Sequence, residues 1–265
     1  MVCNAPRIRI PMALLLFCFS LNLIQLTTAS SSGAAHHQAG TAKSKIKRSS
    51  CASRKKPNGP ALTETYSGKG TRNPTAGGGG NCAFTKWPVP KGYGPLAIAT
   101  NQWNSAKACG ACIEVEGPGG KFMGIVNDQC PSCEPNGLDL DSNLWNQVSG
   151  NKPPGIIQIK WKIVPCGFSK PVMFMNKTGV SKDWNSIQVQ GANTPLKSLE
   201  VSTDGGSSWT PLEVQSNSNY YQPKNGKGLG TTGDIRVTCL SGKQFVTKNI
   251  ELATPESPKP GSGNC

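Results

Sequence analysis

A short segment, residues 124–141, holds four side chains whose types and spacing could support chemistry. Asp128 follows a short apolar run, and Asp139 stands between two leucines. Cys130 and Cys133 lie between the two aspartates. Carboxyl groups can transfer protons, and a pair of them can cleave a glycosidic bond. We therefore predict that this segment is the functional site. For Asp128 the structural alternative is a turn or strand cap satisfied by backbone N–H groups.

The chain contains two C-x-x-C motifs, and their spacing alone fits a zinc site. Two further cysteines in the same region make an even set of six, which in a secreted protein favours three disulfides over zinc. The sequence does not choose among the possible pairings. The six cysteines are Cys82, Cys109, Cys112, Cys130, Cys133 and Cys166. Cys51, Cys239 and Cys265 are left over, and a link between tails, an intermolecular bond or a free thiol stays open for them.

The N-terminus determines the compartment that we expect. Residues 1–29 combine Arg7 and Arg9 with an apolar run and a small-residue cleavage zone, which is typical of a secretory signal peptide. An N-terminal membrane anchor is the alternative. Secretion places the chain in an oxidising compartment. Residues 30–60 are rich in Ser, Gly and Lys and predict a disordered basic leader.

The charge is unevenly distributed. Lys and Arg number 28 against 14 acidic residues, but much of the excess lies in residues 43–56. The remaining chain is only mildly basic, which argues against a nucleic-acid partner and suits an acidic polysaccharide or a wall surface.

Short apolar and alternating runs separated by Gly and Pro predict an all-β chain. In residues 61–168 we expect a small β-barrel, with strands at 63–66, 96–99, 112–116, 122–126 and 156–164. A single helix is expected at 142–148, with Asp141 or Ser142 as its N-cap. In residues 169–253 we expect a β-sandwich, with strands at 186–190, 196–201, 209–214, 234–239 and 244–252. Residues 254–265 predict a disordered tail.

Several motifs together resemble the expansin family, closest to its microbial and amoebal members. They occupy residues 65–68, 112–119, 126–128, 137–140, 159–162 and 184–189. The resemblance covers residues 62–253. It implies a six-stranded double-psi β-barrel, similar to that of inverting endoglucanases, followed by an immunoglobulin-like carbohydrate-binding domain. It implies neither a cofactor nor a metal.

The resemblance also implies roles for the site residues. Asp139 matches the general acid of the endoglucanases, and Asp128 and Thr65 match other polar residues of the expansin groove. No residue matches the second catalytic carboxylate. We therefore expect a secreted protein that binds cellulose or β-glucan and loosens wall polysaccharide contacts without hydrolysis. The two leucines beside Asp139 are expected to keep it protonated.

Sugar-binding aromatic residues are expected in both domains, because sugar C–H groups pack against aromatic rings. In the barrel, Cys130 stands where relatives carry an aromatic residue, so Tyr66 or Trp103 is expected to stack on sugar instead. In the second domain, Trp184 and Lys177 match the family's binding surface, while Asp183 replaces an aromatic residue. Tyr220 and Tyr221 are the expected replacements, with one ring facing inward and the other outward.

Other functions are left open by the sequence. The chain could be a glycoside hydrolase or lytic transglycosylase using Asp139, a purely structural wall-binding protein, or a secreted zinc protein. Asn176 begins an N-glycosylation sequon. The expected partner is a cell-wall polysaccharide, with no nucleic acid and no membrane after signal cleavage. We expect a monomer in the extracellular space or cell wall.

Overall fold

The computed structural model describes residues 61–265, which belong to one compact unit, Arg54–Cys265. The predicted signal peptide, the basic leader and Cys51 lie outside the described residues. Within residues 61–265, no helix is both long enough and apolar enough to cross a bilayer.

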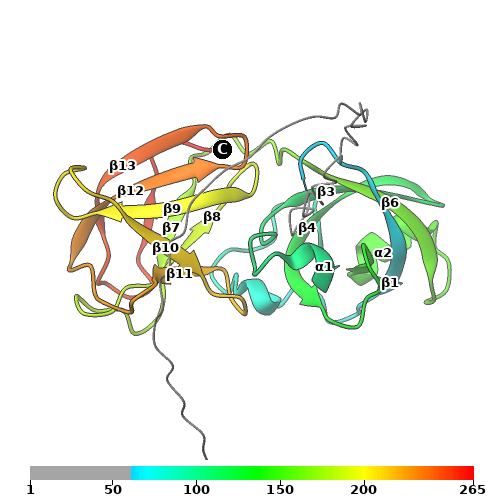
Figure 1. The fold of residues 1–265 in the computed structure, drawn as a ribbon. Coiled ribbons are helices and arrows are strands. Elements are labelled where there is room, and N and C mark those ends of the chain that lie inside the picture. Colours follow the sequence, from blue (N-terminus) through cyan, green and yellow to red (C-terminus); the bar gives the residue numbers. More distant parts are fainter. Residues whose placement is uncertain (1–60) are drawn as a thin grey trace, which may run out of the picture. The chain divides into compact units, whose positions relative to one another are not determined.

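The first domain is a closed barrel of strands in the order β1-β5-β2-β4-β3-β6 (Figure 1). The strands are β1 Tyr66–Arg72, β2 Gly94–Ala99, β3 Cys112–Gly117, β4 Gly120–Cys130, β5 Leu138–Leu140 and β6 Ile157–Val164. The connecting segments contain a 3₁₀ turn, η1 Gly80–Cys82, and the helices α1 Thr100–Trp103 and α2 Ser142–Ser149. The predicted six-stranded barrel is confirmed.

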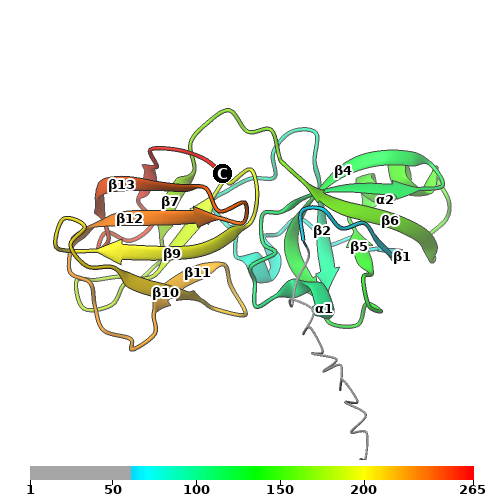
Figure 2. The ribbon, with the colours of Figure 1, turned by 45° about the horizontal axis from the view of Figure 1, so that its top comes forward.

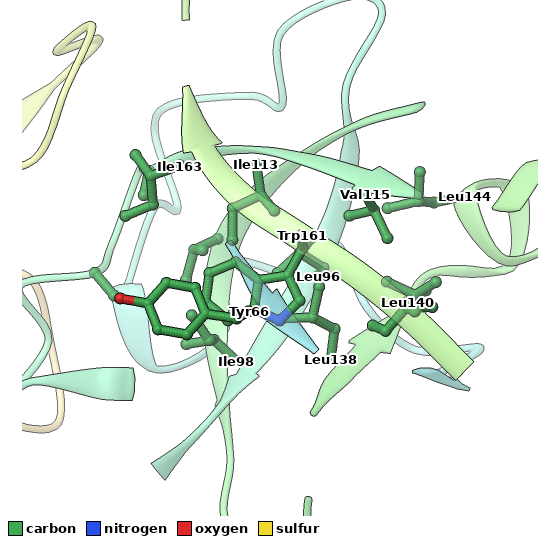
Figure 3. Packing of buried hydrophobic residues seen from close by; sticks show 14 of the residues in the cluster. Tyr66, Leu96, Ile98, Ile113, Val115, Leu138, Leu140, Leu144, Trp161 and Ile163 are labelled. Carbon is green, nitrogen blue, oxygen red and sulfur yellow. The ribbon is translucent and has the colours of Figure 1, made fainter. Parts of the chain in front are cut away.

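The barrel interior is filled by alternate residues of its strands, because successive side chains of a strand point to opposite faces. In β6 the inward residues are Ile157, Ile159, Trp161 and Ile163. Figure 3 shows how such residues from several strands meet in one core. The ring of Tyr66 stacks on Trp161, with 4.5 Å between ring centroids.

Helix α2 begins where the sequence predicted it. Asp141 is its N-cap and accepts hydrogen bonds from the backbone N–H groups of Asn143 and Leu144. Gly150 ends the helix in a left-handed conformation that glycine adopts without strain. The buried face of α2 packs against the barrel core through Leu144, Trp145 and Val148.

The second domain is an eight-stranded sheet in the order β13-β12-β9-β10-β11-β8-β7-β14. Its strands are β7 Met173–Asn176, β8 Ile187–Gln190, β9 Leu196–Ser202, β10 Thr210–Val214, β11 Tyr220–Pro223, β12 Thr232–Cys239, β13 Gln244–Glu251 and β14 Pro258–Pro260. Figure 2 shows β9, β12 and β13 side by side. Phe174 and Ile187, from β7 and β8, share a core with Leu199 and Ile235, from β9 and β12. The sheet therefore folds over its own core, and the predicted sandwich is confirmed.

Two predictions about chain segments are wrong. The first strand spans Tyr66–Arg72, where the sequence predicted a strand at residues 63–66. Within the C-terminal residues 254–265, Pro258–Pro260 form β14, which pairs with β7. An edge strand tolerates proline because only one of its sides must donate hydrogen bonds, so composition alone misidentified this tail as disordered.

All six cysteines expected in the barrel are paired. The disulfides are Cys82–Cys109, Cys112–Cys166 and Cys130–Cys133. A fourth disulfide, Cys239–Cys265, fixes the C-terminus to β12. The zinc alternative is wrong, because disulfide sulfur atoms are not available as thiolate ligands. Among residues 61–265, no cluster of His, Cys, Asp and Glu has the geometry to hold a metal ion.

Candidate functional site

The barrel brings the two predicted carboxylates to one face through strand register. Thr71 of β1 lies opposite Asp139 of β5, and Asp139 lies opposite Ala97 of β2. Ala97 in turn lies opposite Asp128 of β4. Residues opposite one another in neighbouring strands point to the same side of the sheet. These four residues, which we call the polar row, therefore form one line across four strands.

Asp139 is half-buried and has a specific partner in the polar row. The Thr71 hydroxyl donates a hydrogen bond of 2.7 Å to Asp139 Oδ1. Leu138 and Leu140 are fully buried in the barrel core, on the opposite face of β5. They do not surround the Asp139 carboxyl group, so the predicted apolar environment around it is wrong.

Asp128 is held by backbone groups, as its structural alternative predicted. Its Oδ1 accepts hydrogen bonds from Asn81 N (2.7 Å) and Gln129 N (2.8 Å). Gly80 makes the first contact possible. It has a φ of +45°, and a Cβ added there would lie 2.4 Å from Asp128 Cβ. The glycine run before Asn81 thus allows the loop to close directly onto the carboxylate.

Thr65, the third predicted polar residue, does not belong to this row. It is exposed and precedes β1, whereas Thr71 contacts Asp139. The position of β1 explains the error, because the strand begins one residue after Thr65 and places a different threonine opposite Asp139. A predicted strand that continued beyond Tyr66 would have included Thr71 as a candidate partner of Asp139. The glycine run before Asn81 is likewise a signal in the sequence that could have indicated a close approach of the Asn81 backbone to Asp128.

The Cys130–Cys133 disulfide borders the same face. Cys130 lies two residues after Asp128 on β4 and opposite Ala99 of β2. The disulfide closes the turn that leads from β4 toward Asp139. Beside it, Lys69 and Glu134 form an ion pair of 2.6 Å. The turn between the two aspartates is therefore held both covalently and electrostatically.

Neither aromatic residue predicted for the barrel groove is available to a sugar. Tyr66 is 9% exposed, and its hydroxyl donates to Glu64. Burial is the main cause of a raised pKa for Tyr66. Trp103 is 4% exposed, and its indole Nε1 donates to the Ser216 carbonyl. Both rings complete the core, so neither presents a face for stacking, although the exposed edge of Trp103 borders a cleft described below.

The second domain also buries residues that were expected to bind. Tyr220 and Tyr221 are 8% and 4% exposed, so neither ring forms an outward platform. Burial raises the pKa of both hydroxyl groups. The Lys177 ammonium lies 5.4 Å from the centroid of the Tyr220 ring. Trp184 is only half-buried, which leaves part of its indole able to contact a ligand.

Asn176 does not fit its predicted role as a glycosylation site. It is 2% exposed, and its Nδ2 donates to the carbonyl groups of Glu251 and Thr254, each at 3.0 Å. A glycan on Nδ2 would break these bonds and could not reach solvent. Asn176 therefore has a structural role, and the predicted glycosylation does not fit its position.

Comparison with known proteins identifies the family. No family model matches the chain. It is 31% identical over 197 residues to expansin-YoaJ of Bacillus subtilis, covering 73% of this chain and 78% of that protein. The chain belongs to the expansin family, and its barrel is the double-psi barrel predicted above.

Solved structures support the same assignment. The apo-expansin of Clavibacter michiganensis matches with a TM-score of 0.67 and 25% identity, covering 76% of this chain and 98% of that one. A mutant of that expansin in complex with cellohexaose matches with a TM-score of 0.64, at 24% identity and the same coverage. The two-domain arrangement is thus that of a known expansin.

Proposed function

We propose that this expansin binds cellulose or a related β-glucan and loosens contacts between wall polysaccharides without hydrolysis. The observation that carries the proposal is the polar row, in which Thr71 positions Asp139 in line with Asp128. The related Clavibacter michiganensis expansin in complex with cellohexaose supports a β-glucan as ligand.

The arrangement of the two carboxylates favours a non-hydrolytic action. Inverting hydrolysis needs one carboxyl group to protonate the leaving oxygen and a second to activate water. Asp128 is the other carboxylate of the polar row, and its Oδ1 already accepts two backbone hydrogen bonds. The backbones of Asp128 and Asp139 lie two strand spacings apart, or about 10 Å. Asp128 is therefore better placed as a fixed acceptor than as a mobile base.

Loosening follows from competition between hydrogen bonds. A single hydrogen bond in water contributes a net of about 1 kcal/mol, so contacts between glucan chains are individually weak and exchangeable. Carboxylate oxygens are strong acceptors for sugar hydroxyl groups. In this proposal, Asp139 and Asp128 accept hydrogen bonds from hydroxyl groups of one glucan chain. These bonds replace the hydrogen bonds between that chain and a neighbouring chain. No covalent bond changes.

The protein acts outside the cell in this proposal. The signal-like sequence of residues 1–29 and the four disulfides favour an oxidising compartment. The partner is a wall polysaccharide and the protein acts as a monomer, with no nucleic acid and no membrane involved.

The test is a wall-extension assay of Asp139→Asn beside the unaltered protein, with released reducing ends measured in the same samples. We expect extension without sugar release, and loss of extension in the variant. Reducing ends that disappear with Asp139→Asn would instead show a glycosidase or lytic transglycosylase. Extension that survives Asp139→Asn, with cellulose binding lost in Trp184→Ala, would show a purely structural wall-binding protein.

A further inference from the structure

A cleft of about 640 Å³ lies near the end of β4, and Trp103 is the one lining residue that the sequence predicted to bind sugar. It begins at Gln129, the residue after Asp128, and passes the end of α1. On its other side are Ser216 and Asn217, in the connection between β10 and β11. The cleft is therefore lined by residues of both the barrel and the second domain.

A strained turn forms one wall of this cleft. Asn104, Ser105 and Ala106 follow one another with φ values of 50°, 52° and 65°, a left-handed conformation that is unfavourable for residues other than glycine. Such strain persists only where surrounding contacts hold it, and it clusters at functional sites. The turn therefore requires firm anchors on both sides.

The anchors are visible in the structure. Ala106 has no exposed surface and lies in the barrel core. Cys109, shortly after it, is bonded to Cys82. On the other side, Trp103 donates its indole N–H to the Ser216 carbonyl at 2.8 Å, which ties the turn to the opposite wall of the cleft. Ala106 is thus buried in the barrel core, while Asn104 and Ser105 line the cleft.

The chemistry of the walls defines the ligand. Every residue that lines the cleft is uncharged, and amides and hydroxyl groups predominate, including Asn101, Asn104, Ser105, Gln129 and Asn217. Within residues 61–265, the side chains of Asn104 and Asn217 make no hydrogen bond to another protein group. An amide both donates and accepts, as a sugar hydroxyl does, so these side chains can bind paired hydroxyl groups.

We propose that this cleft binds a single, neutral polysaccharide chain through hydrogen bonds. The inference rests on the proposed function and deepens it, because it names the form of the ligand. A crystalline glucan surface is bound by a row of exposed rings. Of the rings predicted to bind sugar, only Trp184 is partly exposed, and Tyr66, Trp103, Tyr220 and Tyr221 are all buried, so there is no row. A recessed cleft with amide walls instead suits one separated chain. The protein therefore selects loose or amorphous glucan over crystalline surfaces.

The test is a calorimetric titration with soluble cellohexaose of the unaltered protein and of Asn104→Gly/Asn217→Ala. Glycine accepts the positive φ at residue 104, so the turn is retained while the amide is removed. Asn249→Gly is the matched control, because Asn249 is exposed, has a φ of 54° and lies on β13 rather than in the cleft. Circular dichroism checks that each variant is folded.

We expect the double variant to bind cellohexaose about tenfold more weakly, since each neutral hydrogen bond changes affinity by a few-fold. The control should bind as the unaltered protein does. Equal binding by the double variant would overturn the inference and leave the proposed function standing. If the unaltered protein bound neither cellohexaose nor cellulose, the proposed function itself would be wrong, and the inference with it.

Two further measurements test the form of the ligand. Polygalacturonate, a negatively charged polysaccharide, should not compete with cellohexaose for the cleft. If it competed in the unaltered protein but not in the double variant, the assignment of a neutral chain would be wrong. The unaltered protein should also bind more to acid-swollen than to microcrystalline cellulose, and the double variant should lose this preference. An equal preference in both proteins would contradict the proposed selection of separated chains.

Discussion

Thr71 and Asp139 lie far apart in the sequence and meet because β1 and β5 pair in one register. A shift of one residue along β1 would turn the Thr71 side chain to the other face and remove its hydroxyl from Asp139. The geometry of the carboxylate thus depends on a single neighbouring hydroxyl group. Asp128 is positioned differently, by backbone N–H groups that a side-chain substitution at Asn81 would leave in place.

We expect Thr71→Val to lower wall extension several-fold while the fold is retained. Valine has a similar shape and suits a β-strand, but it cannot donate the 2.7 Å hydrogen bond that orients Asp139. The measurement is wall extension at equal protein concentration. Thr210→Val, at an exposed position on β10, is the matched control. Full extension by Thr71→Val would show that Asp139 needs no orienting partner.

Among the elements, the turn after β4 has the most direct connection to the site. The Cys130–Cys133 disulfide links residues only three apart in sequence, whereas Cys112–Cys166 links residues 54 apart. In the chain-entropy model a disulfide stabilises less when it closes a shorter loop, about 2 kcal/mol here against about 4 kcal/mol for the longer one. The short disulfide therefore constrains the turn more than it stabilises the whole fold.

Replacing both cysteines of this turn with serine should separate these two effects. For Cys130→Ser/Cys133→Ser we expect a small fall in melting temperature and a clear loss of wall extension, because the segment between Asp128 and Asp139 becomes mobile. Cys112→Ser/Cys166→Ser should lower the melting temperature more. Thermal unfolding and extension are measured on the same samples. A short-disulfide variant that extends walls normally would show that the turn needs no covalent constraint.

At the scale of the whole molecule, a buried polar contact joins the second domain to the barrel. Gln188 of β8 is fully buried and donates through Nε2 to the carbonyl groups of Cys82 and Ala83. Its Oε1 accepts a hydrogen bond of 2.6 Å from Gln190. This contact fixes η1, which contains Asn81, and the backbone N–H of Asn81 donates to Asp128. The junction and the site are thus connected through one short segment.

Gln188→Ala should lower the free energy of unfolding by about 1–3 kcal/mol, because the substitution leaves buried carbonyl groups without a donor. Denaturant unfolding measures this change. Gln158→Ala, at an exposed position on β6, should unfold as the unaltered protein does and serves as the control. Equal stability of the two variants would mean that water replaces the Gln188 contacts without cost.

Local patterns in the sequence predicted much of the fold. The alternation in β6, the Asp141 cap of α2 and the even cysteine count were sufficient because each reflects interactions between close neighbours or a simple chemical requirement. Local composition failed, however, to predict that residues 254–265 contain a strand. There, Pro258–Pro260 is ordered by pairing with β7 and by the Cys239–Cys265 disulfide, both of which join distant parts of the chain.

The sequence by itself determined the two-domain β architecture, the choice of Asp128 and Asp139 as candidate site residues, and the use of the barrel cysteines in disulfides. Only the tertiary structure decided that Thr71 rather than Thr65 contacts Asp139, which cysteines pair, and that Tyr66, Trp103, Tyr220 and Tyr221 are buried. It also placed Asn104 beside Asn217. The physical reason is that strand register and burial depend on contacts between segments distant in sequence, and no local pattern records them.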